Sequence, residues 1–222
     1  MNSLFCLIKF GRKENLEKLI ENGQLRFGAI DDFQKSTEKG RGDKFEGLIN
    51  ISNVYFSKIE CEIPNIKKFT FQPMPNKLFS ITNYTTDSFY SFSSYALTSE
   101  NFKETDIHKI DERMSEFGDY AVVIEEPILF LNEVKRKFTE MNIKFGYQLT
   151  DYKDYKQEGT FEADLFSKTL DLEYQCEHRI LIHTEQNEKE IFIEIGSIKE
   201  FCSLIKSDEI LNIEFKANRS AV

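Results

Sequence analysis

The sequence lacks tryptophan and has few of the residues that mark low-complexity or collagen-like chains. Of its 222 residues only four are proline and ten are glycine, whereas such chains are rich in both. The 21 phenylalanines and nine tyrosines argue against disorder. A chain of this length can bury a substantial core. We therefore expect one globular domain over residues 1–222.

Long apolar runs are also missing. No stretch approaches the roughly 20 apolar residues that a membrane-spanning helix needs. The short apolar run near the N-terminus has no basic region ahead of it, as a signal peptide would have. The sequence therefore predicts a soluble, cytoplasmic protein with no membrane partner.

Cysteine and histidine are few and scattered. The four cysteines form no C-x-x-C pair, and the three histidines show no H-x-x-x-H spacing. A structural zinc site needs about four converging ligands, so we expect no metal. In a reducing compartment the cysteines should be free and mostly buried thiols.

Negative charge exceeds positive charge, with 38 Asp+Glu against 29 Lys+Arg and a net charge of -9. This balance argues against binding nucleic acid through a broad basic face. Residues 1–70, however, hold 12 basic and 10 acidic residues, which leaves room for a local basic groove. If the protein acts on nucleic acid, the residues expected to contact it are Lys9, Arg12, Lys35, Lys39, Arg41 and Lys44.

Hydrophobic periodicity predicts more strands than helices. Strands are expected over residues 4–10, 24–30, 48–71, 77–82, 88–94, 120–125, 143–150, 180–182, 191–195 and 210–215. Helices are expected over residues 15–23, 107–117, 127–138 and 197–206. Residues 31–47 are expected to form a loop or a helix-loop insertion. Because the helices do not alternate regularly with the strands, an α+β fold is favoured over a doubly wound α/β sheet.

Three segments contain residues that can carry chemistry. The first is Arg41–Gly47, where glycines flank a cluster of charges and allow the backbone to approach a ligand. An ordinary charged turn has the same composition. The second is the strand around Ser91 and Ser93, whose hydroxyls share one face by alternation while Phe92 points to the other. An exposed strand face would show the same pattern.

The third segment surrounds Glu177. Alternation along a strand would place Gln175, Glu177 and Arg179 on one face. A carboxylate in a buried strand is costly unless it is paired or functional. Glu177 is therefore a catalytic group, the partner of Arg179 in an internal ion pair, or a residue on a solvent-facing edge.

Several segments together resemble a group of bacterial and phage proteins catalogued as domains of unknown function. They are LFCLIKF, NGQLRFGAIDDF, RGDKFEG, the serine strand, GDYAVVIE and QCEHRIL. The layout of that group is similar to the ADP-ribosyltransferase fold. The resemblance spans nearly the whole chain. It implies a single α+β domain of split antiparallel β-sheets with flanking helices, and it implies NAD as a substrate bound in a cleft.

The resemblance also implies roles for individual residues. Glu177 matches the late catalytic glutamate, and Gln175 has the Gln-x-Glu spacing. Ser91 and Ser93 match the serine strand, although Phe92 replaces the usual small residue between them. The remaining NAD-binding positions are implied for three basic residues. Lys9 or Arg26 would occupy the early basic position, and Arg26 or Arg41 would bind the pyrophosphate.

The function implied is NAD-dependent ADP-ribosyl transfer, by a toxin or a phage-defence effector, to a protein or nucleic-acid acceptor. An antitoxin or regulator protein that covers the cleft is a further expected partner. Two alternatives stay open at this point. One is a non-enzymatic binding module on the same fold, and the other is an NAD hydrolase.

Overall fold

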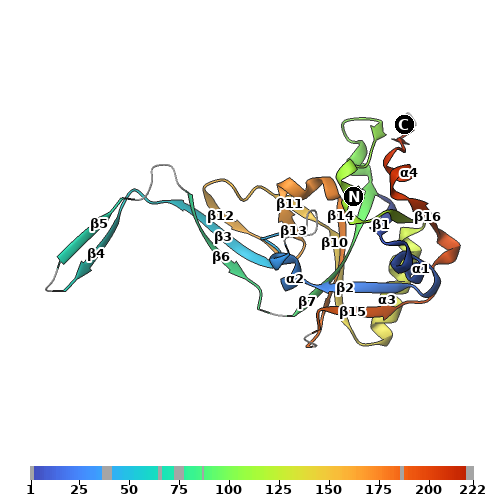
Figure 1. Cartoon of the computed structure of the whole chain (residues 1–222), viewed down its shortest axis with the longest axis horizontal. Helices are drawn as coiled ribbons and strands as arrows, with labels where there is room; N and C mark the ends of the chain where they lie inside the picture. Colours follow the sequence, from blue (N-terminus) through green and yellow to red (C-terminus); the bar gives the residue numbers. More distant parts are fainter. Residues whose placement is uncertain are drawn as a thin grey trace.

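The structure is a computed structural model, and its main body is built on an eight-stranded sheet (Figure 1). It describes residues 3–36, 42–64, 67–72, 78–86, 88–185 and 188–218. All paired strands of this sheet are antiparallel. Its strands are β1 (Leu4–Gly11), β2 (Gln24–Ala29), β7 (Phe89–Thr98), β9 (Tyr120–Ile124), β10 (Lys144–Leu149), β14 (Glu177–His183), β15 (Glu190–Glu194) and β16 (Cys202–Lys206). The fold is mixed α/β, mostly antiparallel sheet with few helices, which agrees with the strand-dominated class predicted from the sequence.

Strand β7 is the place where this sheet forks. One edge of β7 pairs with β14 from Phe89 to Tyr95. Its other edge pairs with two different strands. Residues Tyr90 and Ser91 pair with β2, and the pairing with β1 begins at Tyr95. Residues 92–94 therefore lie between the two diverging partner strands, and a polar site lies at this point.

The sheet has a hydrophobic core on each face. On one face pack the helices α1 (Lys13–Asn22) and α3 (Pro127–Glu140), and on the other pack the 3-10 helix η2 (Glu112–Phe117) and α4 (Ser207–Leu211). Strand β1 is buried on both faces, with Leu7 in the first core and Ile8 in the second. This explains why its sequence is almost continuously apolar.

Helix α1 forms where the sequence predicts a helix. Leu16, Leu19 and Ile20 recur at helical spacing and are buried against the sheet. The helix ends at Gly23, which has φ of 61°. A Cβ atom at this position would lie 2.0 Å from the carbonyl oxygen of Gly196. Glycine is therefore required both by the backbone conformation and by this close contact.

A long β-structured arm projects from the main sheet (Figure 1). Its strands are β3 (Leu48–Tyr55), β4 (Ile59–Ile63), β5 (Lys67–Phe71) and β6 (Leu78–Tyr84). Near the body of the protein, β3 and β6 join β12 (Gly159–Glu162) in a three-stranded sheet of order β12-β3-β6, and β4 pairs with β5 at the far end. Leu48 and Ile51 bury one side of the arm against Tyr155.

The remaining elements are short. They are α2 (Ile30–Lys35), η1 (Ser99–Phe102), β8 (Ile107–His108), β11 (Asp151–Lys153), β13 (Ser167–Thr169), η3 (Leu170–Gln175), η4 (Lys199–Phe201) and β17 (Phe215–Lys216). Strands β11 and β13 pair in parallel, and β8 pairs with β17. Among the described residues, no helix is long and apolar enough to cross a membrane.

Three sequence-based expectations are wrong because tertiary pairing overrides local periodicity. Residues 107–117 form β8 and η2 instead of one helix, since residues 107–108 pair with β17. Residues 197–206 were expected to be helical, but residues 202–206 form β16, which completes the pairing of β9. Residues 210–215 are mainly the end of α4 and a turn. The expectation of mostly buried thiols is also wrong, since only Cys6 of the four free cysteines is buried and Cys61 is exposed.

Candidate functional site

A cavity of about 610 Å³ lies beside the fork of the sheet. Its walls come from β1, β2, β7, β14, β15 and α1. Six of the seven predicted site residues line it: Lys9, Arg26, Ser91, Ser93, Gln175 and Glu177. The seventh, Arg41, lies outside the described residues. The fold thus brings residues separated by up to 168 positions to one cavity.

Glu177 lines this cavity and is itself buried, 4% exposed, and both of its carboxylate oxygens are bound. Oε1 accepts hydrogen bonds from Ser93 Oγ at 2.5 Å and from Arg179 Nε at 2.9 Å. Oε2 accepts one from Lys168 Nζ at 2.5 Å. The backbone N–H of Glu177 donates to the hydroxyl of Tyr152 at 2.8 Å. The side chain is therefore held in one position.

The charge on Glu177 is strongly stabilised. Burial by itself would favour the protonated form, but the Lys168 ammonium and the Arg179 guanidinium outweigh it and hold the pKa of this carboxyl well below its usual range. A group held ionised in this way cannot act as a general acid near neutral pH. It can stabilise positive charge that develops beside it.

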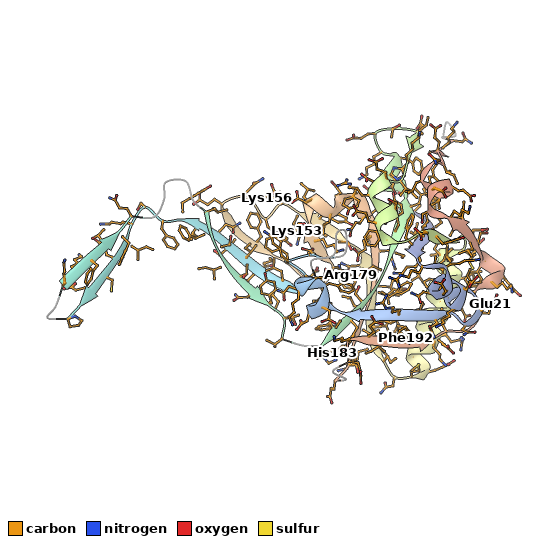
Figure 2. The ribbon with its side chains drawn as sticks, viewed as in Figure 1. Glu21, Lys153, Lys156, Arg179, His183 and Phe192 are labelled. Atoms are coloured by element: carbon orange, nitrogen blue, oxygen red, sulfur yellow. The ribbon has the colours of Figure 1, made fainter. Side chains whose placement is uncertain are left out.

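Arg179 connects Glu177 to the early loop of the sequence. Its side chain is 2% exposed and lies in the interior near the base of the arm (Figure 2). Nη1 and Nη2 donate to the two carboxylate oxygens of Glu46 at 2.6 and 3.2 Å, and Nη1 also donates to the carbonyl of Leu165. The ion pair expected as the alternative role of Glu177 is therefore present, and Arg179 bridges two buried carboxylates.

Asp43, from the same loop as Glu46, completes a cluster of five buried ionisable groups. The cluster contains three carboxyls, Asp43, Glu46 and Glu177, but only two cations, Lys168 and Arg179. Burial is the main cause that raises the pKa of both Asp43 and Glu46. Oδ1 of Asp43 accepts the N–H of Phe45 at 2.9 Å, whereas Oδ2 is buried without a hydrogen-bond partner among the described residues.

Gln175 reaches the cluster by a route that differs from the prediction. It is the last residue of η3 and does not belong to β14. Cys176 turns the chain between them in the left-handed conformation, with φ of 39°. The shared strand face expected for Gln175 and Glu177 is therefore wrong. Their side chains are joined instead by Lys168, whose Nζ donates to Gln175 Oε1 at 2.9 Å and to Glu177 Oε2.

The serine hydroxyls and Lys9 lie at the fork itself. Ser91 Oγ and Ser93 Oγ are 3.2 Å apart. The carbonyl oxygen of Ser93 lies in the part of β7 between the β1 and β2 pairings, and it accepts a hydrogen bond from Lys9 Nζ. The same ammonium lies 4.5 Å from the centre of the Phe92 ring. Phe92, unusual at this position in the resemblance, thus belongs to the wall of the site.

The rim of the cavity is basic although the protein as a whole is acidic. Seven Lys and Arg residues line the cavity against four Asp and Glu residues, a difference of +3 in a chain of net charge -9. Arg12, Lys18 and Lys189 belong to this rim. Arg26, also at the rim, binds Glu190 on the neighbouring strand. The rim therefore offers a local surface for an anionic ligand.

Of the described basic residues that were expected to contact nucleic acid, only Lys9 and Arg12 line the cavity. Lys35 is exposed and pairs with Asp31, and the Lys44 ammonium lies over the ring of Phe45. Lys39 lies outside the described residues, as Arg41 does.

Sequence reasoning missed the part played by Lys168 and Tyr152. Both lie within the polar stretch of residues 151–171, which carries no pattern that would single out either residue. The sequence did point to the region of Glu46, because the segment Arg41–Gly47 was one of the three expected to carry chemistry. Nothing in the sequence, however, pairs that loop with Arg179. Only the packing of the loop against β14 does so.

Comparison of the chain with protein-family models, with curated proteins and with solved structures finds no match. A function for this protein therefore has to be inferred from the residues of the cavity.

Proposed function

We propose that the protein is an NAD-dependent ADP-ribosyltransferase, a toxin or phage-defence effector that modifies a protein or nucleic-acid acceptor. One observation carries the proposal. A buried, ionised glutamate, Glu177, lines a cavity whose rim is basic and is hydrogen-bonded to Ser93 where the sheet forks. The resemblance seen in the sequence points to the same residues.

The chemistry follows from these positions. When the bond between nicotinamide and ribose C1′ breaks, its electron pair leaves with the nicotinamide and positive charge develops on the ribose ring. The Glu177 carboxylate stabilises that charge electrostatically. A nucleophilic oxygen or nitrogen of the acceptor then forms a bond to C1′ and releases its proton to water. The carboxylate needs no proton transfer of its own, which suits its strongly lowered pKa.

Lys168 and Ser93 serve this step by holding the carboxylate in place. Three donors fix the position of the two Glu177 oxygens. A group that is oriented before the reaction does not have to reorganise as charge develops. The pyrophosphate of NAD would lie at the rim, where the guanidinium groups of Arg12 and Arg26 can bind phosphate oxygens in a fork geometry.

The test measures NAD loss and transfer of labelled ADP-ribose in the presence of cellular protein and RNA fractions. Glu177→Gln keeps the shape of the side chain but removes its charge. Loss of one preorganised electrostatic group typically lowers kcat by about 10²–10³-fold, and we expect a loss of that size. The matched control is Glu125→Gln. The exposed carboxylate of Glu125 also accepts a hydrogen bond from a serine, Ser203, with 2.5 Å between Ser203 Oγ and Glu125 Oε1.

Thermal unfolding of each variant separates a chemical effect from a folding defect. Ser93→Ala gives a second, milder perturbation of the same carboxylate and should lower the rate while the fold is retained. If the wild-type protein neither consumes NAD nor transfers ADP-ribose with any fraction, the proposed activity is wrong.

One observation favours a second candidate, a non-enzymatic binding module. Two cations, Lys168 and Arg179, and the hydroxyl of Ser93 already bind both oxygens of the Glu177 carboxylate, as expected for a structural ion-pair network. Calorimetry with NAD distinguishes the two candidates. Binding without turnover, unchanged in Glu177→Gln, supports the module, whereas release of nicotinamide without any added acceptor identifies a hydrolase.

A further inference from the structure

The outer edge of the arm differs from every other long edge of the protein. Strand β6, LFSITNY, is the last strand of the sheet β12-β3-β6. It pairs with β3 over its whole length, from Leu78 to Tyr84. In the part of the chain that the structure describes, its other edge has no strand partner. The strand has seven residues and contains no charge, no proline and no glycine.

The other sheet edges are protected. Natural edge strands commonly carry charged residues, proline or bulges, which prevent pairing with another chain. Each other edge strand of five or more described residues follows this rule. The protecting charges are Lys144 in β10, Lys206 in β16, Glu190 in β15, Glu60 in β4 and Lys67 in β5. Among the described strands, β6 is the longest edge strand and lacks this protection, so its edge is suited to pairing.

We propose that β6 pairs with β6 of a second copy of this chain, antiparallel about a two-fold axis near Ile81, to form a dimer with a continuous six-stranded sheet. An uncharged strand can pair with itself without placing like charges opposite each other. Ile81 lies at the centre of the strand and is 60% exposed. In this register Ile81 meets its own copy, and the two side chains cover each other.

The charge distribution and the shape of the molecule favour a second copy of this chain as the partner of β6. Residues 48–86 contain four lysines and two glutamates, a net charge of +2, so the rest of the chain carries -11. Two acidic bodies repel each other, and a contact through their surfaces would bring these charges together. The arm extends away from the main sheet (Figure 1). Pairing through β6 therefore places the contact on the least acidic part of the molecule.

The experiment measures the molar mass of the purified chain by light scattering after size-exclusion chromatography. The wild-type chain should reach about twice 26.1 kDa. Ile81→Lys places a charge at the centre of the edge and should return the protein to the monomer at the same concentration. The matched control is Ile128→Lys on α3, because Ile128 is equally exposed, at 60%. That variant should stay dimeric.

A cross-linking experiment tests the register without adding charge. Ile81→Cys is made together with Cys61→Ser, because Cys61 on β4, at the far end of the arm, is an exposed thiol. Residues directly opposite in an antiparallel pair have Cβ atoms about 4.5–5.5 Å apart, so mild oxidation should link two chains. Ile128→Cys in the same background should not cross-link.

Two results would overturn the proposal. The first is a wild-type chain that remains monomeric up to millimolar concentration, which would show that β6 does not pair with a second copy of this chain. The second is a dimer that persists in Ile81→Lys and does not cross-link through Ile81→Cys, which would place the interface elsewhere. Neither result depends on NAD or on the proposed enzymatic activity.

Discussion

Replacing Arg179 by methionine gives a direct test of the buried charge network. Methionine keeps much of the volume but removes the charge and four hydrogen bonds. One goes to Glu177 at 2.9 Å, two go to Glu46 at 2.6 and 3.2 Å, and one goes to the carbonyl of Leu165. Removing one partner of a buried ion pair typically costs about 3–5 kcal/mol. Domains are stable by only about 5–15 kcal/mol. We therefore expect Arg179→Met to lose a large part of its free energy of unfolding.

The loss should depend on pH. Without the guanidinium, the pKa values of Glu46 and Glu177 rise in the folded variant, while in the unfolded chain a glutamate titrates near 4.3. Above that pH the folded variant then binds more protons than the unfolded chain, so its stability increases as the pH falls. The difference between wild type and variant should be smaller at pH 5 than at pH 7.5.

Urea unfolding at both pH values measures the effect, and Arg136→Met is the control. Arg136 also pairs with two carboxylates, Glu133 at 2.7 Å and Glu140 at 2.6 Å, but its side chain is 51% exposed. Exposed pairs contribute about 1 kcal/mol or less. Equal losses for the two variants, or a loss for Arg179→Met that does not change with pH, would refute the reasoning.

Two further predictions concern neighbours of Glu177. Lys168→Met removes a cation 2.5 Å from Glu177 Oε2, so the pKa of this carboxyl should rise and NAD cleavage should fall on the acidic side of the pH–rate profile, with Lys168→Arg restoring it. Burial lowers the pKa of His178 to about 4. Between about pH 6.5 and pH 4 the unfolded chain therefore binds a proton at this histidine and the folded chain does not. The free energy of unfolding should fall by about 3 kcal/mol as the pH drops through this range. His178→Leu should flatten the fall in stability over this range in urea titrations, and an unchanged slope would contradict the assignment.

Local patterns in the sequence correctly predicted the elements in which the buried residues recur at a regular spacing. The apolar run of residues 4–10, the helical spacing of Leu16, Leu19 and Ile20, and the stop at Gly23 are all observed. The spacing fails where a distant strand decides the outcome. Residues 202–206 become a strand because β9 offers an unpaired edge, and that edge is not visible in the local sequence.

The candidate site shows the same division. Alternation identified Ser91, Ser93 and Glu177 as chemically capable residues, and the charge count located a basic tendency in the first third of the chain. Whether Glu177 faces Ser93, and which cations hold its charge, depends on residues 168 and 179 lying beside it in space.

The sequence by itself thus determined a strand-rich fold, its buried strands and a short set of polar residues that could form the site. It could do so because apolar residues recur with the period of the strand or helix that buries them. Only the tertiary structure decided that Glu46 from the early loop, Lys168 from β13 and Arg179 from β14 meet around Glu177. The physical reason is that electrostatic energy depends on distance and desolvation. Both are properties of the folded chain and not of any one segment.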